Sequence, residues 1–122
     1  MPASWQTGAS IPTSFPDGTS NTILFAEKYA QCGVGGTVGG TLWGRFVPDL
    51  YLPVFGAWNT GKFQSRPTAA RCDPTLASTP FSGGINVCLA DGSCRTVSMG
   101  ISQVTWWAAC TPAGGEVLGS DW

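Results

Sequence analysis

The segment GGINVCLADGSC, residues 83–94, decides the fold of this chain. Apolar residues alternate with other residues up to the pair Asp91-Gly92, after which the chain starts back, as in a β-hairpin. An Asp-Gly pair suits a two-residue type I′ turn, because both central residues of that turn need a positive φ. We therefore predict a hairpin that turns at Asp91-Gly92, and we interpret the pair as structural and not catalytic.

A two-residue turn also fixes which residues face each other across the hairpin. It places Leu89 opposite Cys94, and Cys88 opposite Arg95. Because side chains alternate between the two faces of a strand, Cys88 and Cys94 are predicted to point in opposite directions and not to bond each other. One face is predicted to carry Ile85, Val87, Leu89 and Cys94, and the other to carry Asn86, Cys88, Ala90, Ser93, Arg95 and Val97.

Length and composition indicate one globular domain over residues 1–122. Hydrophobic residues make up 43% of the chain and charged residues 11%, with 17 glycines and 9 prolines. This is a turn-rich chain with few charges for its surface. Such a surface suits assembly or an extracellular setting.

Several classes of function are disfavoured by the residue types. The chain has no histidine, which removes the commonest general base and the commonest zinc ligand. The net charge is -1 and the basic residues are scattered, so we expect no nucleic-acid partner. No stretch approaches the ~20 apolar residues that span a bilayer, and we expect no membrane contact by this segment.

The remaining elements follow from local patterns. Gln103–Cys110 is predicted to be a helix, with Ser102 as its N-cap, Ile101 stapled onto Trp106, and Pro112 preventing continuation. A strand is predicted over about residues 22–29. The other expectations are loop at 1–18, a glycine connector at 32–40, strand-like edges at 41–47 and 51–58, an ordered long loop at 59–82, and a bend with a short strand at 113–119. Together these predict an α+β domain, mainly antiparallel β, with a short C-terminal helix.

Three separated segments, FPDGTSNTILFAEK (15–28), SGGINVCLADGSC (82–94) and ISQVTWWAACTPAGGEVLGSDW (101–122), resemble the planctomycete prepilin-like proteins that carry a His-x9-Asp-Gly motif. The matching residues of the late hairpin are Gly83, Gly84, Asn86, Asp91 and Gly92. Those of the other two segments are Asp17, Gly18, Thr19, Ser20, Asn21, Trp106, Gly114, Gly115 and Glu116. The match covers both ends of the chain in the family's order.

One departure concerns the motif itself, because the histidine of the family falls at Phe81. A phenyl ring only packs, which weakens any metal or acid-base role for the motif. Members of the family typically begin with a prepilin leader and a long apolar helix. The resemblance therefore implies that this chain corresponds to the C-terminal head of such a protein, a pilin-like or pseudopilin-like globular domain without the N-terminal helix.

We expect no cofactor and no catalytic residues. The one ion for which the matched segments offer ligands is calcium, at Asp17, Asp91, Glu116 and Asp121, although EF-hand spacing is absent.

The 5 cysteines have no C-x-x-C spacing and indicate an exported domain with disulfides. The preferred bridge joins Cys32 to Cys72, since both lie in loops that are costly to order. A second bridge from Cys94 to Cys110 requires the helix to pack on the Ile85 face. Free buried thiols in the hairpin are an equally good account.

The sequence thus predicts a structural subunit of a type IV pilin-like or secretion-associated assembly, extracellular or on the cell surface, whose partners are itself or related subunits. Whichever ring of Trp106-Trp107 points outward is the candidate assembly contact. The alternative is an extracellular carbohydrate- or ligand-binding module, which would use exposed rings among Trp5, Trp43, Trp58, Trp106, Trp107 and Trp122.

Overall fold

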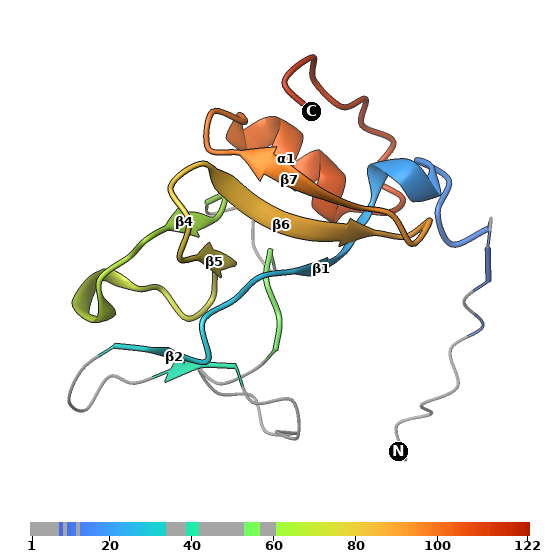
Figure 1. Cartoon of the computed structure of the whole chain (residues 1–122). Helices are drawn as coiled ribbons and strands as arrows, with labels where there is room; N and C mark the ends of the chain where they lie inside the picture. The colour runs from blue at the N-terminus through green and yellow to red at the C-terminus, as the bar shows by residue number, and fades with distance from the viewer. Residues whose placement is uncertain (1–7, 9, 12, 34–38, 42–52, 57–60) are drawn as a thin grey trace.

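The computed structural model describes residues 8, 10, 11, 13–33, 39–41, 53–56 and 61–122 (Figure 1). The largest sheet is three-stranded and antiparallel, in the order β1-β6-β7. Two-stranded pairs form between β2 and β3, antiparallel, and between β4 and β5, parallel. In chain order the elements are η1 Thr19–Asn21, β1 Ile23–Ala26, β2 Gln31–Cys32, β3 Gly39–Gly40, β4 Gln64–Ser65, η2 Ala69–Arg71, β5 Ser78–Thr79, β6 Gly84–Leu89, β7 Cys94–Ser98 and α1 Gln103–Cys110.

The late hairpin is present as β6 and β7, but the predicted turn is wrong. The Leu89 amide donates to the Ser93 carbonyl oxygen at 2.8 Å, and the Gly92 amide donates to the Leu89 carbonyl oxygen at 3.0 Å. The loop is therefore residues 90–92. Only Gly92 has a positive φ, 86°, as in a type I turn followed by a left-handed glycine. This loop relieves Asp91 of the strained positive φ that a type I′ turn would impose.

The longer loop shifts the strand register by one residue and so corrects the predicted faces. Cys88 lies opposite Cys94, and Ile85 lies opposite Val97. Cys88 and Cys94 consequently project from the same face and form a disulfide, with Cα atoms 4.1 Å apart. The prediction that they do not bond each other is wrong. Val97 is 3% exposed and faces the core, also against prediction.

β1 is shorter than the predicted strand and pairs with β6 on the side away from β7. Its register shifts between Ile23, opposite Leu89, and Phe25, opposite Cys88. The bulge keeps Ile23 buried while Phe25 is 58% exposed on the outer side of the sheet.

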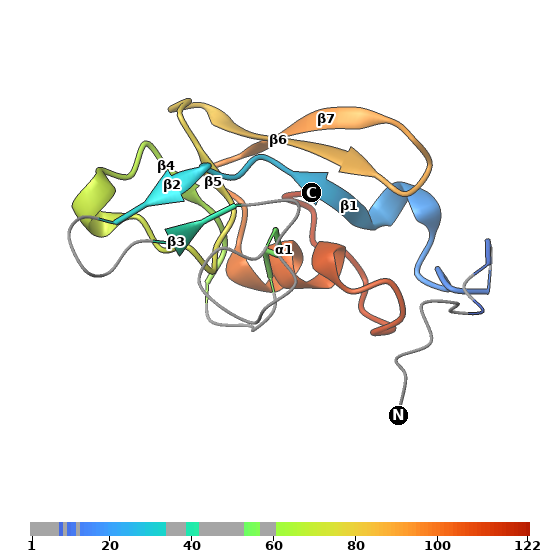
Figure 2. The same cartoon turned by 90° about the horizontal axis from the view of Figure 1, so that it is seen from below.

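The helix prediction is confirmed. α1 spans Gln103–Cys110, and the Ser102 side chain accepts from the Thr105 amide at 3.2 Å. Figure 2 shows the large sheet on one side of α1, so the helix covers its inner face. Ile101 and Trp106, the predicted staple, are both 1% exposed.

The Trp106 ring lies at the centre of the core, 5.0 Å from the Phe63 ring centroid and 6.4 Å from that of Phe55. The core cluster around it comprises Ile23, Phe63, Ala77, Ile85, Val87, Leu89, Val97, Ile101 and Ala109. It is filled from both the sheet and the helix, which makes one packed unit of the late hairpin and α1.

Two further predictions, a loop at 59–82 and a short strand within 113–119, need correction. The described part of the predicted loop 59–82 contains β4, η2 and β5, because the Gln64 and Arg66 amides donate to the carbonyl oxygens of Ala77 and Thr79. The predicted strand within 113–119 is not formed, and that segment is irregular. The tail that follows it comes back to the start of α1, where Asp121 bonds to Ser102 and Thr105. The strand-like edges at 41–47 and 51–58, and the middle of the glycine connector, fall largely outside the described residues.

The chain is thus a small α+β domain, mostly antiparallel, with one short C-terminal helix and, among the described residues, no long N-terminal helix. None of the described helices has the length and apolarity to cross a membrane.

Candidate functional site

The segments that carry the family resemblance meet in space. The amide of Asp91, in the hairpin loop, donates to the Thr19 carbonyl oxygen at 3.2 Å, and the Ala90 amide donates to the Thr22 carbonyl oxygen at 2.9 Å. Within the first segment, the Asn21 side-chain amide donates to the Asp17 carbonyl oxygen at 3.0 Å. The motif DGTSN therefore forms a compact 3-10 turn on which the hairpin loop rests.

Asp17 joins this turn to the C-terminal motif. The Gly115 amide donates to Asp17 Oδ1 and Oδ2 at 3.1 and 3.2 Å, and the Asp17 amide donates to the Pro112 carbonyl oxygen at 3.3 Å. Gly115 has a φ of 75°, which a residue with a Cβ adopts at a cost. The carboxylate and the glycine thus form one clamp between distant parts of the chain.

Asp91 is used inside its own loop. Its Oδ1 accepts from the Ser93 amide at 2.9 Å and from the Ser93 hydroxyl at 2.6 Å. These bonds, the hydroxyl first, lower the pKa of the Asp91 carboxyl. The arrangement favours the charged carboxylate as a hydrogen-bond acceptor that shapes the turn.

Asp121 anchors the end of the chain to the start of α1. The Thr105 hydroxyl donates to Oδ1 at 2.6 Å and the Ser102 amide donates to Oδ2 at 2.7 Å. These two bonds, Thr105 first, lower the pKa of Asp121 to about 2. The carboxylate satisfies a helix-start amide in the way that a capping-box Glu does within one helix.

Three of the four calcium candidates therefore accept hydrogen bonds at separate places in the fold: Asp17 from Gly115, Asp91 from Ser93 and Asp121 from Ser102. The fourth, Glu116, accepts from the Thr111 hydroxyl at 3.2 Å. Among the residues that the structure describes, no group of three or more His, Cys, Asp or Glu side chains is arranged to hold a metal ion. The structure does not bring the four calcium candidates together as a ligand set.

The position of the family's histidine lies on the outer side of the sheet. Phe81 is 56% exposed and borders a shallow hollow of about 340 Å³ with Gly83, Gly84, Asn86 and Thr96. The Asn86 side chain accepts from the Thr96 hydroxyl at 2.8 Å and donates to Glu27 Oε1 at 3.0 Å. The polar groups beside Phe81 are thus bonded to one another, from Glu27 just after β1 through Asn86 in β6 to Thr96 in β7.

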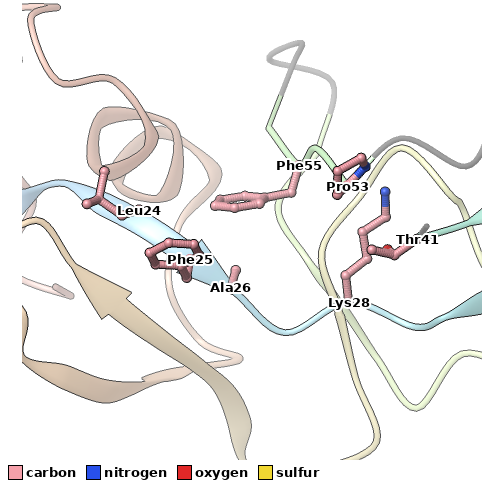
Figure 3. A pocket seen from close by; sticks show the side chains of 7 residues that line it. All are labelled: Leu24, Phe25, Ala26, Lys28, Thr41, Pro53 and Phe55. Atoms are coloured by element: carbon pink, nitrogen blue, oxygen red, sulfur yellow. The ribbon is translucent and has the colours of Figure 1, made fainter. Parts of the chain in front are cut away.

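A second hollow, of about 290 Å³, lies beside β1 and was not anticipated from the sequence. Figure 3 shows Leu24 and Phe25 at one end, Lys28 and Thr41 at the other, and Phe55 between them. The Lys28 ammonium donates to the Val54 carbonyl oxygen at 2.8 Å. Burial lowers the pKa of Lys28, while the negative charge of Asp73 acts in the opposite direction. The volume of this hollow lies at the lower limit, ~300 Å³, of the range found for ligand pockets.

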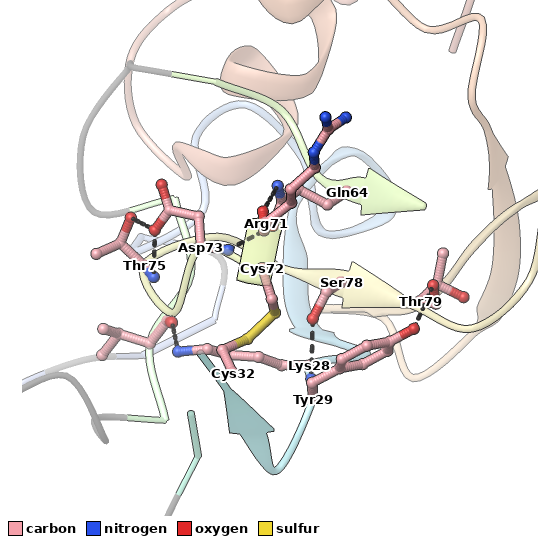
Figure 4. Close-up of a disulfide and its surroundings, with 11 residues drawn as sticks. Lys28, Tyr29, Cys32, Gln64, Arg71, Cys72, Asp73, Thr75, Ser78 and Thr79 are labelled. Atoms are coloured by element: carbon pink, nitrogen blue, oxygen red, sulfur yellow. Dashed lines mark hydrogen bonds between the residues drawn. A yellow bond between two sulfur atoms is a disulfide. The ribbon is translucent and has the colours of Figure 1, made fainter. Parts of the chain in front are cut away.

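The predicted disulfide between Cys32 and Cys72 is present, with Cα atoms 5.1 Å apart (Figure 4). Hydrogen bonds surround it: the Tyr29 amide donates to Ser78 Oγ at 2.9 Å, and the Asp73 amide donates to Gln64 Oε1 at 2.7 Å. The bridge pins the long 61–82 segment against β2, as the sequence predicted for Cys72.

Cys110 is the free cysteine, so the alternative bridge from Cys94 to Cys110 is wrong. Burial raises the pKa of its thiol to about 12. A thiol in that state is neutral and poorly nucleophilic, and Cys110 serves as a small core side chain.

The three tryptophans in the described residues differ in burial. Trp106 is 1% exposed, Trp107 is half-buried, and the Arg95 guanidinium lies 4.6 Å from the centre of the half-buried Trp122 ring. Trp106 is therefore the inward ring of the pair and Trp107 the one turned sideways. Trp5, Trp43 and Trp58 lie outside the described residues.

Two contacts of this region escaped the sequence analysis. The Cys88–Cys94 disulfide had a signal, since a loop of residues 90–92 ending in glycine is a known hairpin connection. The Asp121 anchor had none, because it depends on how the C-terminal tail returns to Ser102. No family model, curated protein or solved structure matches this chain.

Proposed function

We propose that this domain is a structural subunit of an extracellular or cell-surface assembly, of the pilin-like kind that its resemblance to the prepilin-like proteins implies. The observation that carries the proposal is the use of its carboxylates. Asp17, Asp91 and Asp121 each accept hydrogen bonds from groups of the chain itself. Asp17 and Asp121 hold distant segments together, and Asp91 shapes its own loop. The resembling residues have a structural purpose that requires no chemistry.

The surface supports the same proposal. Large apolar side chains are exposed in β1 and α1 and in two irregular segments: Phe25 is 58% exposed, Val104 77%, Phe81 56% and Val117 92%. Since charged residues make up only 11% of the chain, few charges would be desolvated when copies pack together.

The disulfides fit the proposed location. Cys32–Cys72 and Cys88–Cys94 are formed, and disulfides persist in oxidising compartments. They hold the 61–82 segment and the hairpin in fixed positions, which a repeated contact between subunits requires.

The carbohydrate-binding alternative draws no support from the described tryptophans. The Trp106 ring fills the core and Arg95 lies over Trp122. Apart from the half-buried Trp107, a stacking platform would have to come from Trp5, Trp43 and Trp58, which lie outside the described residues. A glycan array with Trp43→Ala and Trp58→Ala variants tests that alternative, because a subunit without lectin activity gives no signal that depends on these rings.

The experiment that tests the proposal is immunogold electron microscopy of intact source cells, using antibodies raised against the folded domain. The expected result is labelling in rows or patches on the cell surface, absent after deletion of the gene. Labelling confined to the cell interior would overturn the proposal.

A further inference from the structure

The β1-β6-β7 sheet ends in two different edges. At the β1 edge the register shifts between Ile23 and Phe25, which interrupts the row of peptide groups. At the β7 edge the register with β6 runs without a break from Cys94 to Ser98. Within the described part of the chain β7 is the last strand on that side.

The hairpin geometry fixes which peptide groups of β7 point outward. Leu89 and Ser93 are hydrogen-bonded across the hairpin, and bonded and non-bonded pairs alternate in an antiparallel ladder. Arg95 and Val97 therefore bond to β6. Cys94, Thr96 and Ser98 turn their amide and carbonyl groups to the free edge, and all three residues are exposed.

β7 lacks several of the devices that protect natural edges. It has no proline, no lysine and no bulge, and its one charge, Arg95, is folded over the Trp122 ring at 4.6 Å. The edge is also stiffened from the outer side by the Cys88–Cys94 disulfide and by the bond from Thr96 Oγ1 to Asn86 Oδ1 at 2.8 Å. A stiff, regular strand loses little entropy when another strand pairs with it.

We infer that β7 pairs antiparallel with β7 of a second copy of this chain, around a two-fold axis at Thr96. This inference names one contact between subunits, and it rests on the proposed function only in requiring that copies meet. The pairing joins the two sheets into one continuous sheet through their outermost strands.

The side chains of β7 suit its own copy. In this register Thr96 meets Thr96, a favourable cross-strand pair, and Cys94 meets Ser98. Arg95 lies opposite Val97, so the only charges on the strand do not face each other. The Ser98 carbonyl already accepts from the Ile101 amide at 3.1 Å, which leaves about four new backbone hydrogen bonds, two at Thr96 and two from Ser98 amides to Cys94 carbonyls.

Amide hydrogen exchange followed by NMR tests this pairing, with the protein concentration raised from about 10 μM to about 1 mM. The Arg95 and Val97 amides should exchange slowly at every concentration. The Thr96 and Ser98 amides should exchange about tenfold or more slowly at the higher concentration. Exchange of the Thr96 amide at one unchanged, rapid rate would overturn the inference.

Two variants make the test specific. Thr96→Pro removes the outward N–H and leaves the ladder to β6 intact, so it should stay monomeric by analytical ultracentrifugation while the Val97 amide remains protected. Thr96→Val keeps the N–H and the branched shape, and should still pair. If the proline variant loses the protection of Val97, Thr96→Lys replaces it, because two lysines would face each other on the axis and prevent pairing. Pairing that survives Thr96→Lys would overturn the inference.

The outcomes separate this inference from the proposed function. Association with an unprotected Thr96 amide refutes β7 pairing and leaves the surface-assembly proposal standing. Pairing at Thr96 together with labelling inside the cells supports the pairing and refutes the surface role.

Discussion

The Gly115 amide donates to the carboxylate of Asp17, which lies 98 positions earlier in the chain. This contact ties the turn before β1 to the tail after α1, and the same turn supports the hairpin loop through the bond from the Asp91 amide to the Thr19 carbonyl oxygen. The residues that resemble a family motif are therefore a set of clamps between segments that are distant in sequence.

Replacing Asp17 by Ala should lower the free energy of unfolding by about 1 kcal/mol, because a charged acceptor on a partly exposed site is lost. Urea unfolding followed by tryptophan fluorescence measures the change. Asp17→Asn keeps an acceptor oxygen and should lose less. Equal stability of the wild type and the alanine variant would show that the clamp contributes nothing.

The left-handed Gly92 gives a second prediction with a matched control. Gly92→Ala forces a Cβ onto a φ of 86° and should cost about 1 kcal/mol. Gly83→Ala, where a Cβ meets nothing within 4 Å, should be nearly neutral in the same thermal unfolding assay. If both variants unfold at the wild-type temperature, the loop has a different conformation.

The two disulfides should contribute different amounts to the free energy of unfolding, because they close loops of different length. Cys32–Cys72 spans 40 positions and Cys88–Cys94 spans 6. Chain entropy gives ~4 kcal/mol for the first and ~2 kcal/mol for the second. Urea unfolding of the paired serine variants checks the order. A larger loss for Cys88→Ser/Cys94→Ser would mean that the hairpin bridge acts chiefly on the folded state.

The Asp121 carboxylate predicts a pH dependence with a definite sign. Its pKa falls from 3.8 to about 2 in the folded protein, so the unfolded state binds its proton first as the pH drops. The stabilisation is complete above pH 3.8 and is lost between that value and about 2. Asp121→Asn should lose stability at neutral pH and show a weaker decline over this range. Parallel acid-unfolding curves for the two proteins would contradict the prediction.

Cys110 should behave as an unreactive thiol. Since burial raises its pKa to about 12, alkylation by iodoacetamide at neutral pH should be slow in the folded protein. In denaturant it should proceed to one label per chain, because the other cysteines are in disulfides. Rapid labelling of the native protein at Cys110 would show that the site opens.

The sequence by itself determined the elements whose causes are local. Ser102, the apolar pair Ile101 and Trp106, and Pro112 lie within a few residues of one another, and they set both ends of α1 correctly. The alternation before Asp91 located the hairpin for the same reason. The entropy cost of ordering two loops also indicated Cys32 and Cys72 as disulfide partners.

Only the tertiary structure decided the features that depend on the strand register and on the path of the C-terminal tail. A loop one residue longer than predicted brought Cys88 to Cys94 and turned Val97 inward, because side chains alternate with a period of two. The contacts of Asp17 with Gly115 and of Asp121 with Ser102 depend on the path of the C-terminal tail after Thr111. Local spacing carries no information about such long-range contacts, which go together with the packing of Leu118 and Trp122 against the core.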